Sequence, residues 1–111
     1  MKSALLIDVL GFQGCPNVQL TLELVEAIVQ SEGIQAKVNS VDVSSLEDAE
    51  RLRFLGSPTV QINGIDIESS RRHEEQFSFS CRVYRFGNET SGVPPEIWLR
   101  SAIQSSIRSM P

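Results

Sequence analysis

The feature that most constrains the fold is the junction at Gly14-Cys15-Pro16-Asn17-Val18, where an apolar run gives way to a helical pattern. Residues 3–9 form an apolar run broken by one acid, which predicts a buried central strand. From Pro16 the apolar residues partly follow helical spacing as far as Gly33, which predicts a helix between these two residues. Cys15 is therefore expected at the amino end of a helix.

This position favours a reactive cysteine. Unpaired backbone N–H groups and the helix dipole stabilise negative charge at the amino end of a helix. A thiolate is such a charge, so Cys15 is predicted to be more reactive than a free thiol. The competing interpretation is that Cys15 is a small, inert apolar residue beside the helix cap, as many free cysteines are.

The middle of the chain continues the alternation of strand and helix. Residues 34–43 alternate in polarity and predict a second strand, after which Ser44 or Ser45 can cap a short helix. That helix is expected to run to about Phe54, with Gly56 ending it. Residues 57–62, opened by Pro58, predict a third strand. Asn63-Gly64 is a strong hairpin signal that returns the chain as a fourth strand at residues 65–67.

The last third is less regular. Residues 69–80 are polar and predict a loop with room for a short helical turn, followed by an extra strand or extended segment at 81–84. Residues 87–92 are expected to be a turn region. Val93-Pro94-Pro95-Glu96 starts the last helix, for which the expected apolar face is Ile97, Trp98, Ala102, Ile103 and Ile107.

Composition limits the functional classes. The 111 residues suit one domain, residues 1–111. A net charge of −4 argues against nucleic-acid binding, which needs a basic surface. No apolar run has the length of a signal peptide core or a membrane span, so we expect a cytoplasmic protein that does not bind membranes. In a reducing compartment, its two cysteines are expected to be redox-active, metal-binding or inert rather than a structural disulfide.

With Cys15 placed after the first strand and Pro58 within Gly56-Ser57-Pro58-Thr59-Val60, the chain resembles the thioredoxin fold. The resemblance implies an α/β fold in the order βαβαββα, with a central mixed four-stranded sheet and an insertion before the last helix. It also implies that Pro58 is cis and faces Cys15, whereas most X–Pro bonds are trans. A cis Pro58 would leave neighbouring backbone groups for an extended thiol or peptide substrate. Four residues would then line the substrate groove: Pro16, Ser57, Pro58 and Thr59.

A narrower resemblance rests on three segments: Gly14-Cys15-Pro16-Asn17, residues 55–60 and Ser80-Cys81-Arg82-Val83-Tyr84. Together they are similar to a bacterial group of small thioredoxin-like proteins, some of whose relatives are linked to alkylmercury lyase. The link implies thiol or soft-metal chemistry.

The chain departs from the dithiol pattern at Val18, which stands where thioredoxins have a second cysteine. Val18 can neither attack nor be oxidised, so dithiol reduction by the helix motif alone is not expected. Cys81 is the candidate resolving cysteine, which requires its Cα to approach that of Cys15 within about 7 Å. The alternative is that Cys81 packs in the insertion and never meets Cys15.

Two further candidates are weaker. Cys15, Cys81 and His73 offer two thiolates and an imidazole, a set that suits a soft or borderline metal, although no short ligand spacing is present. Asp8 could be a proton acceptor if buried in the first strand, or could have a structural role there. No cofactor is expected.

The sequence therefore predicts a thiol–disulfide oxidoreductase with Cys15 and Cys81 as catalytic residues, acting on a thiol or disulfide substrate or partner protein. The competing prediction is a non-catalytic thioredoxin-like domain that binds a protein or a soft metal ion. The sequence leaves the oligomeric state open.

Overall fold

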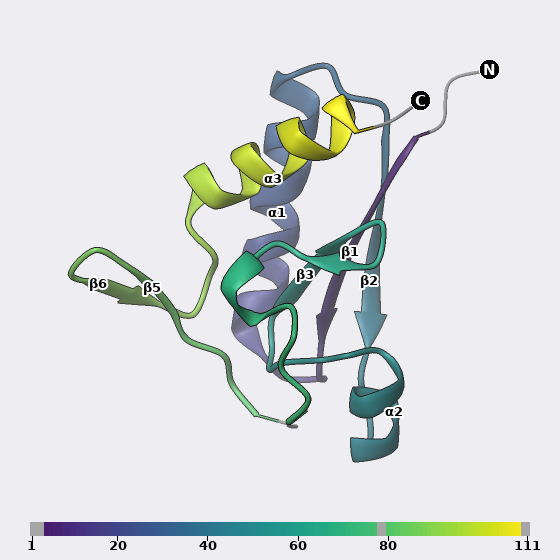
Figure 1. The fold of residues 1–111 in the computed structure, drawn as a ribbon, viewed down its shortest axis with the longest axis vertical. Coiled ribbons are helices and arrows are strands. Elements are labelled where there is room, and N and C mark those ends of the chain that lie inside the picture. The colour runs from purple at the N-terminus through teal and green to yellow at the C-terminus, as the bar shows by residue number, and fades with distance from the viewer. Residues whose placement is uncertain (1–3, 78–79, 110–111) are drawn as a thin grey trace.

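The computed structural model describes residues 4–77 and 80–109. In this part the chain forms a mixed α/β structure with a four-stranded sheet, a separate two-stranded hairpin and three α-helices (Figure 1). None of the described helices combines the length and apolar character needed to cross a membrane. The elements in chain order are β1 (Leu5–Gly11), α1 (Pro16–Ser31), β2 (Ala36–Asp42), α2 (Leu46–Arg51), β3 (Thr59–Ile62), β4 (Ile65–Asp66), the 3-10 turn η1 (Ser69–Arg71), β5 (Tyr84–Phe86), β6 (Glu89–Ser91) and α3 (Glu96–Arg108).

The main sheet is mixed, with strand order β2-β1-β3-β4. β1 pairs in parallel with β2 and antiparallel with β3, so that Ile7 lies opposite Val38 on one side and Ile62 on the other. β3 returns as β4 through Asn63-Gly64, where both residues have positive φ angles of 52° and 82°. Such angles at both turn residues are those of a type I′ turn, so the hairpin prediction is confirmed.

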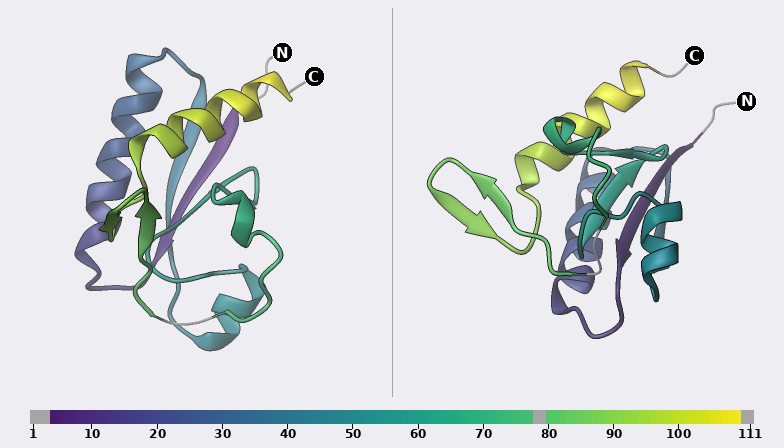
Figure 2. Two further views of the ribbon diagram at one scale, coloured as in Figure 1. Left: turned by 60° about the vertical axis from the view of Figure 1, so that its left-hand side comes forward. Right: turned by 60° about the horizontal axis from the view of Figure 1, so that its bottom comes forward.

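One face of the sheet is covered by α1 and α3 (Figure 2). Alternate residues of β1 point to this face, because side chains alternate along a strand. Helix α1 contributes Val25 and Ile28, and α3 contributes Leu99 and Ile103. All the residues that form this core are buried: Leu5, Ile7, Val9, Val25, Ile28, Val60, Ile62, Ile67, Leu99 and Ile103.

The other face is covered by α2 only near the end of β1. There Leu10 packs with Val43, Ala49 and Phe54 in a smaller core. Asp8 lies on the same face of β1 and is half-buried, and its carboxylate accepts a hydrogen bond from the side-chain amide of Asn39 at 3.0 Å. That contact gives Asp8 a structural partner on the neighbouring strand.

Helix α1 begins where it was predicted, and helix α2 ends earlier. α1 begins at Pro16, and Cys15 lies directly before it at the N-cap position. α2, capped by Ser45, ends at Arg51 instead of running to Phe54. Arg53 takes a positive φ of 55°, which turns the chain so that Phe54 enters the small core.

The prediction of the apolar face of α3 is partly wrong. Ile97 and Ile107 remain 59% and 40% exposed, whereas Leu99 is fully buried. The helix presents the row through Leu99 and Ile103 to the sheet, because these residues are four apart and lie on one helical face.

The region predicted as a turn at residues 87–92 contains a strand. β5 and β6 form an antiparallel hairpin that projects from the body of the protein (Figure 1). The Phe86 ring packs edge-on against Trp98 of α3, with the ring centroids 6.1 Å apart. Within the predicted loop at 69–80, residues 69–71 form the turn η1, and residues 78–79 lie outside the described residues.

Gly11, at the end of β1, should not tolerate a side chain. A Cβ there would collide with Val18 and would lie 2.6 Å from Ser57 Oγ. We expect Gly11→Ala to lower the free energy of unfolding by about 1–3 kcal/mol, the usual cost of overpacking. Denaturant titration measures the change.

The collision can be tested with a double-mutant cycle. Val18→Ala removes the methyl groups that the new Cβ would meet, so the Gly11→Ala/Val18→Ala protein should lose less than the sum of the single losses. Strictly additive losses would contradict the close packing of Gly11 against Val18.

Candidate functional site at the amino end of helix α1

Cys15 is held at the start of α1 by backbone contacts on both sides. Its N–H donates to Phe12 O at 3.2 Å, and its carbonyl accepts from Val18 N at 3.4 Å. Its φ and ψ of −78° and 113° are extended, as an N-cap requires. The thiol is unpaired, half-buried, and makes no capping hydrogen bond. A 16-residue helix therefore begins directly after a half-buried cysteine that is not in a disulfide.

A cavity of about 500 Å³ adjoins Cys15 on the side of β2. It lies where β1 and β2 end and α1 begins, and Val43 N–H fixes this corner by donating to Gly11 O at 2.8 Å. Among the described residues that line it, Asp42 alone carries a charge. The full lining consists of Gly11, Phe12, Gln13, Gly14, Cys15, Val18, Gln19, Leu22, Ser40, Val41 and Asp42.

The side chains of Val18 and Ser57 both pack against Gly11, which lines this cavity. Both side chains approach the position that a Gly11 Cβ would occupy. Ser57 is completely buried, and within the described part of the chain its hydroxyl has no hydrogen-bond partner. Because buried hydroxyls are usually paired, this orphaned group is a notable feature of the site.

The loop before β3 is covered by the strap, the segment Ser80-Cys81-Arg82. Ser57 N–H donates to Ser80 O at 2.8 Å, and Arg82 N–H donates to Ser57 O at 2.9 Å, so that Cys81 lies opposite Ser57. The Ser57–Pro58 peptide bond is cis, as predicted. The expectation of free backbone groups beside Pro58 is wrong for Ser57, because the strap occupies both its N–H and its carbonyl.

Arg82 anchors the strap through a buried ion network. Its guanidinium binds both carboxylate oxygens of Asp66, at 2.8 and 3.0 Å, and Glu68 at 2.9 Å. It also donates to the Thr59 hydroxyl at 3.1 Å. Burial by itself would lower the pKa of Arg82, but the hydrogen bond and negative charge of Asp66 and the contact with Glu68 raise it above its usual value. Arg82 is therefore a permanent cation in this position.

Tyr84 connects the network to the cis-proline loop. Its hydroxyl donates to Pro58 O at 2.6 Å, and the Arg82 guanidinium lies over its ring, 4.6 Å from the centroid. Burial raises the pKa of Tyr84 above its usual value of 10.0, and the nearby carboxylates of Asp66 and Glu68 add to the effect, whereas Arg82 opposes it.

The predicted groove residues have different surroundings. Pro16 is exposed beside Cys15, but Ser57, Pro58 and Thr59 are buried beneath the strap and Tyr84. Thr59 is used internally, since its hydroxyl donates to Gly56 O at 2.6 Å. The buried residues therefore support the loop and present no open groove.

The two cysteines have different surroundings. Cys15 adjoins the cavity, and Cys81 is exposed and unpaired on the strap. Cys81 lies opposite Ser57, and Val18, three residues after Cys15, approaches Gly11 as Ser57 does. His73 is exposed in the loop after η1. Within residues 4–77 and 80–109, no three His, Cys, Asp or Glu residues assemble a metal site, so the Cys15, Cys81 and His73 set is not brought together.

Sequence reasoning missed the network around Arg82. A signal was present at Ile65-Asp66-Ile67, because an acid between apolar strand residues needs a buried cation or hydrogen-bond donor. The sequence did not show which of its arginines would supply that charge. The other missed residues that line the cavity come from three elements: Phe12 from the turn after β1, Gln19 from α1 and Asp42 from the end of β2.

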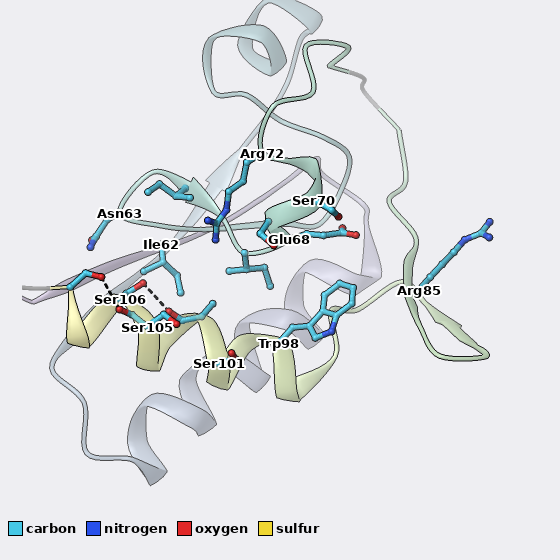
Figure 3. A pocket seen from close by; sticks show the side chains of 15 residues that line it. Ile62, Asn63, Glu68, Ser70, Arg72, Arg85, Trp98, Ser101, Ser105 and Ser106 are labelled. Atoms are coloured by element: carbon cyan, nitrogen blue, oxygen red, sulfur yellow. Dashed lines mark hydrogen bonds between the residues drawn. The ribbon is translucent and has the colours of Figure 1, made fainter.

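Another cavity, of about 880 Å³, lies between α3 and the segment from β3 to η1 (Figure 3). Trp98, Ile62 and the serines Ser101 and Ser105 of α3 line it, and Arg72 reaches across its rim. None of the residues that line it belongs to the turn at Cys15 or to the strap.

No family model matches the chain, and no match was found among curated proteins or solved structures. Inferences about function therefore depend on the geometry of the site and on the resemblance carried by its motifs.

Removing the Arg82 charge should destabilise the protein strongly. Arg82→Met leaves Asp66 buried without its cation, and we expect a loss of about 3 kcal/mol in the free energy of unfolding. Arg71→Met is the matched control, because Arg71 pairs with the more exposed Glu74 and should cost less than about 1 kcal/mol. Denaturant titration compares the two. Equal losses would contradict the network as the anchor of the strap.

The single tyrosine reports on the same region. Because the pKa of Tyr84 is raised on folding, its contribution to stability is complete below pH 10.0 and is lost as the pH rises above that value. We expect no tyrosinate absorbance from folded protein near pH 10.0 and its appearance only together with loss of circular dichroism. Ordinary titration near pH 10.0 with intact circular dichroism would contradict the burial of Tyr84.

Proposed function

We propose that this protein is a thioredoxin-like thiol–disulfide oxidoreductase that uses Cys15 as its nucleophile. The observation that carries the proposal is the unpaired thiol of Cys15, the residue at the N-cap position of α1, which adjoins a cavity. The thiolate is the form of cysteine that attacks a disulfide.

The arrangement of elements supports the thioredoxin-like part of the proposal. A parallel β1–α1–β2 unit precedes the antiparallel pair β3 and β4, and α3 returns to the face that carries α1. The cis peptide at Ser57–Pro58 agrees with the resemblance of this loop to its counterpart in that family. The hairpin β5–β6 belongs to the insertion before α3.

The proposed reaction begins with attack of the Cys15 thiolate on one sulfur of a disulfide substrate. A new S–S bond forms to Cys15 while the substrate S–S bond breaks, and the second substrate sulfur leaves with the electron pair as a thiolate. Cys15 is then held in a mixed disulfide, and Val18 offers no thiol to resolve it.

Cys81 is the proposed resolving thiol. Residues paired across neighbouring strands project to the same face, so Cys81 shares the face of Ser57, whose hydroxyl lies against Gly11 and Val18. Attack by the Cys81 thiolate on the Cys15 sulfur forms the Cys15–Cys81 disulfide and releases the remaining substrate sulfur as a thiolate. Two equivalents of an external thiol then reduce this disulfide and are themselves oxidised to a disulfide.

The alternative function is a binding domain that keeps the same fold without catalysis. The observation that favours it is Val18, which occupies the position of the usual second thiol. In that case Cys15 and Cys81 would hold a protein partner or a soft metal ion without turnover.

Single-cysteine variants distinguish the two functions. With hydroxyethyl disulfide as substrate and a thiol reductant, Cys15→Ser should reduce turnover to the uncatalysed rate. Cys81→Ser should still form the mixed disulfide at Cys15 but accumulate it, because resolution by the external thiol is slower. Mass spectrometry of the quenched protein identifies each species.

Mild oxidation of the wild-type protein provides the complementary measurement. We expect a monomer with an intramolecular Cys15–Cys81 disulfide. Exclusively intermolecular dimers would rule out Cys81 as the resolving thiol. If Cys15 reacts with disulfides no faster than free cysteine does, the binding domain becomes the better description.

A further inference from the structure

We propose that the substrate disulfide is a small molecule, neutral or cationic, that reaches Cys15 through the cavity beside β2 and not along the cis-proline loop. This inference rests on the proposed function and specifies its substrate class. Two observations lead to it: the strap covers the cis-proline loop, and a cavity beside β2 adjoins Cys15.

The loop side is closed to an extended peptide. A peptide that docks as an added strand needs free backbone N–H and carbonyl groups on the protein. At Ser57 both groups are bonded to the strap, and the Pro58 carbonyl accepts from Tyr84. The Arg82 side chain holds the strap in place through Asp66 and Glu68, so displacing it would leave buried charges unpaired.

The β2 side is open. The cavity of about 500 Å³ has the size of a site for a small ligand and includes Cys15 in its wall. Phe12, Leu22 and Val41 supply apolar surface, and Gln19 supplies an amide. A molecule with a short apolar chain and a central disulfide would fit this combination.

The charge of the cavity selects among small disulfides. Asp42 is the charged residue among the described residues of its lining, and it is exposed at the end of β2. A carboxylate there attracts a cation and repels an anion. For unit charges a few ångströms apart in water, each effect changes the rate about threefold, so together they separate a cationic from an anionic disulfide by about tenfold.

The test compares the rates at which Cys15 forms a mixed disulfide with cystamine, hydroxyethyl disulfide and dithiodipropionate, which are cationic, neutral and anionic. Rates are followed at low salt by mass spectrometry of the peptide that contains Cys15, so that reaction at Cys81 is counted separately. After correction for the rate of each disulfide with free cysteine, we expect cystamine to react about tenfold faster than dithiodipropionate. Asp42→Asn should bring the two rates to within about twofold of each other.

Glu26→Gln is the matched control, because it also removes one exposed carboxylate but lies about 16 Å along α1 from Cys15. It should leave the charge preference unchanged. A Glu26→Gln effect as large as that of Asp42→Asn would overturn the assignment of Asp42, since it would reflect net charge alone.

A fourth substrate tests the route of entry. The disulfide of a short neutral cysteine peptide should react no faster than hydroxyethyl disulfide. A gain of about tenfold from the flanking peptide would overturn the small-molecule assignment while leaving the proposed function intact. Reaction of Cys15 with every disulfide at the rate of free cysteine would instead remove the proposed function, and this inference with it.

Discussion

The structure around the cis-proline loop depends on the buried ion network of Arg82 with Asp66 and Glu68. Arg82 comes from the insertion before α3, whereas both acids come from the end of the main sheet. A guanidinium removed from water must keep its carboxylate partners, because an unpaired buried charge costs several kcal/mol. The network thereby fixes the strap against the cis-proline loop.

This constraint gives the two sides of Cys15 different properties. Toward the loop, Ser57 and Pro58 are occupied by the chain itself through backbone and Tyr84 hydrogen bonds. Toward β2, the thiol adjoins a cavity whose shape follows from the turn after β1. The cis-proline loop resembles one that docks peptides, but the strap of the same chain already occupies its backbone groups. Cys81 lies on that segment, which is why its role as a resolving thiol and the closure of the loop are linked.

Local signals in the sequence predicted much of the α/β framework. The helix starts at Pro16 because proline suits the first turn, and Asn63-Gly64 turns because both residues accept positive φ. Errors arose where tertiary packing overrode the local pattern. Arg53, and not Gly56, turns the chain after α2 because Phe54 must reach the small core. Leu99 replaces Ile97 on the buried face of α3 because the sheet selects which row of the helix it contacts.

The sequence alone determined that a cysteine lies at the amino end of the first helix and that no second thiol follows it at Val18. Those are local facts, since helix caps and residue spacing depend on neighbours in the chain. Only the tertiary structure decided that Arg82 pairs with Asp66, that the strap covers Ser57, and that an open cavity remains beside β2. Charge pairing and burial between segments far apart in sequence depend on how the chain folds back on itself, which no local pattern encodes.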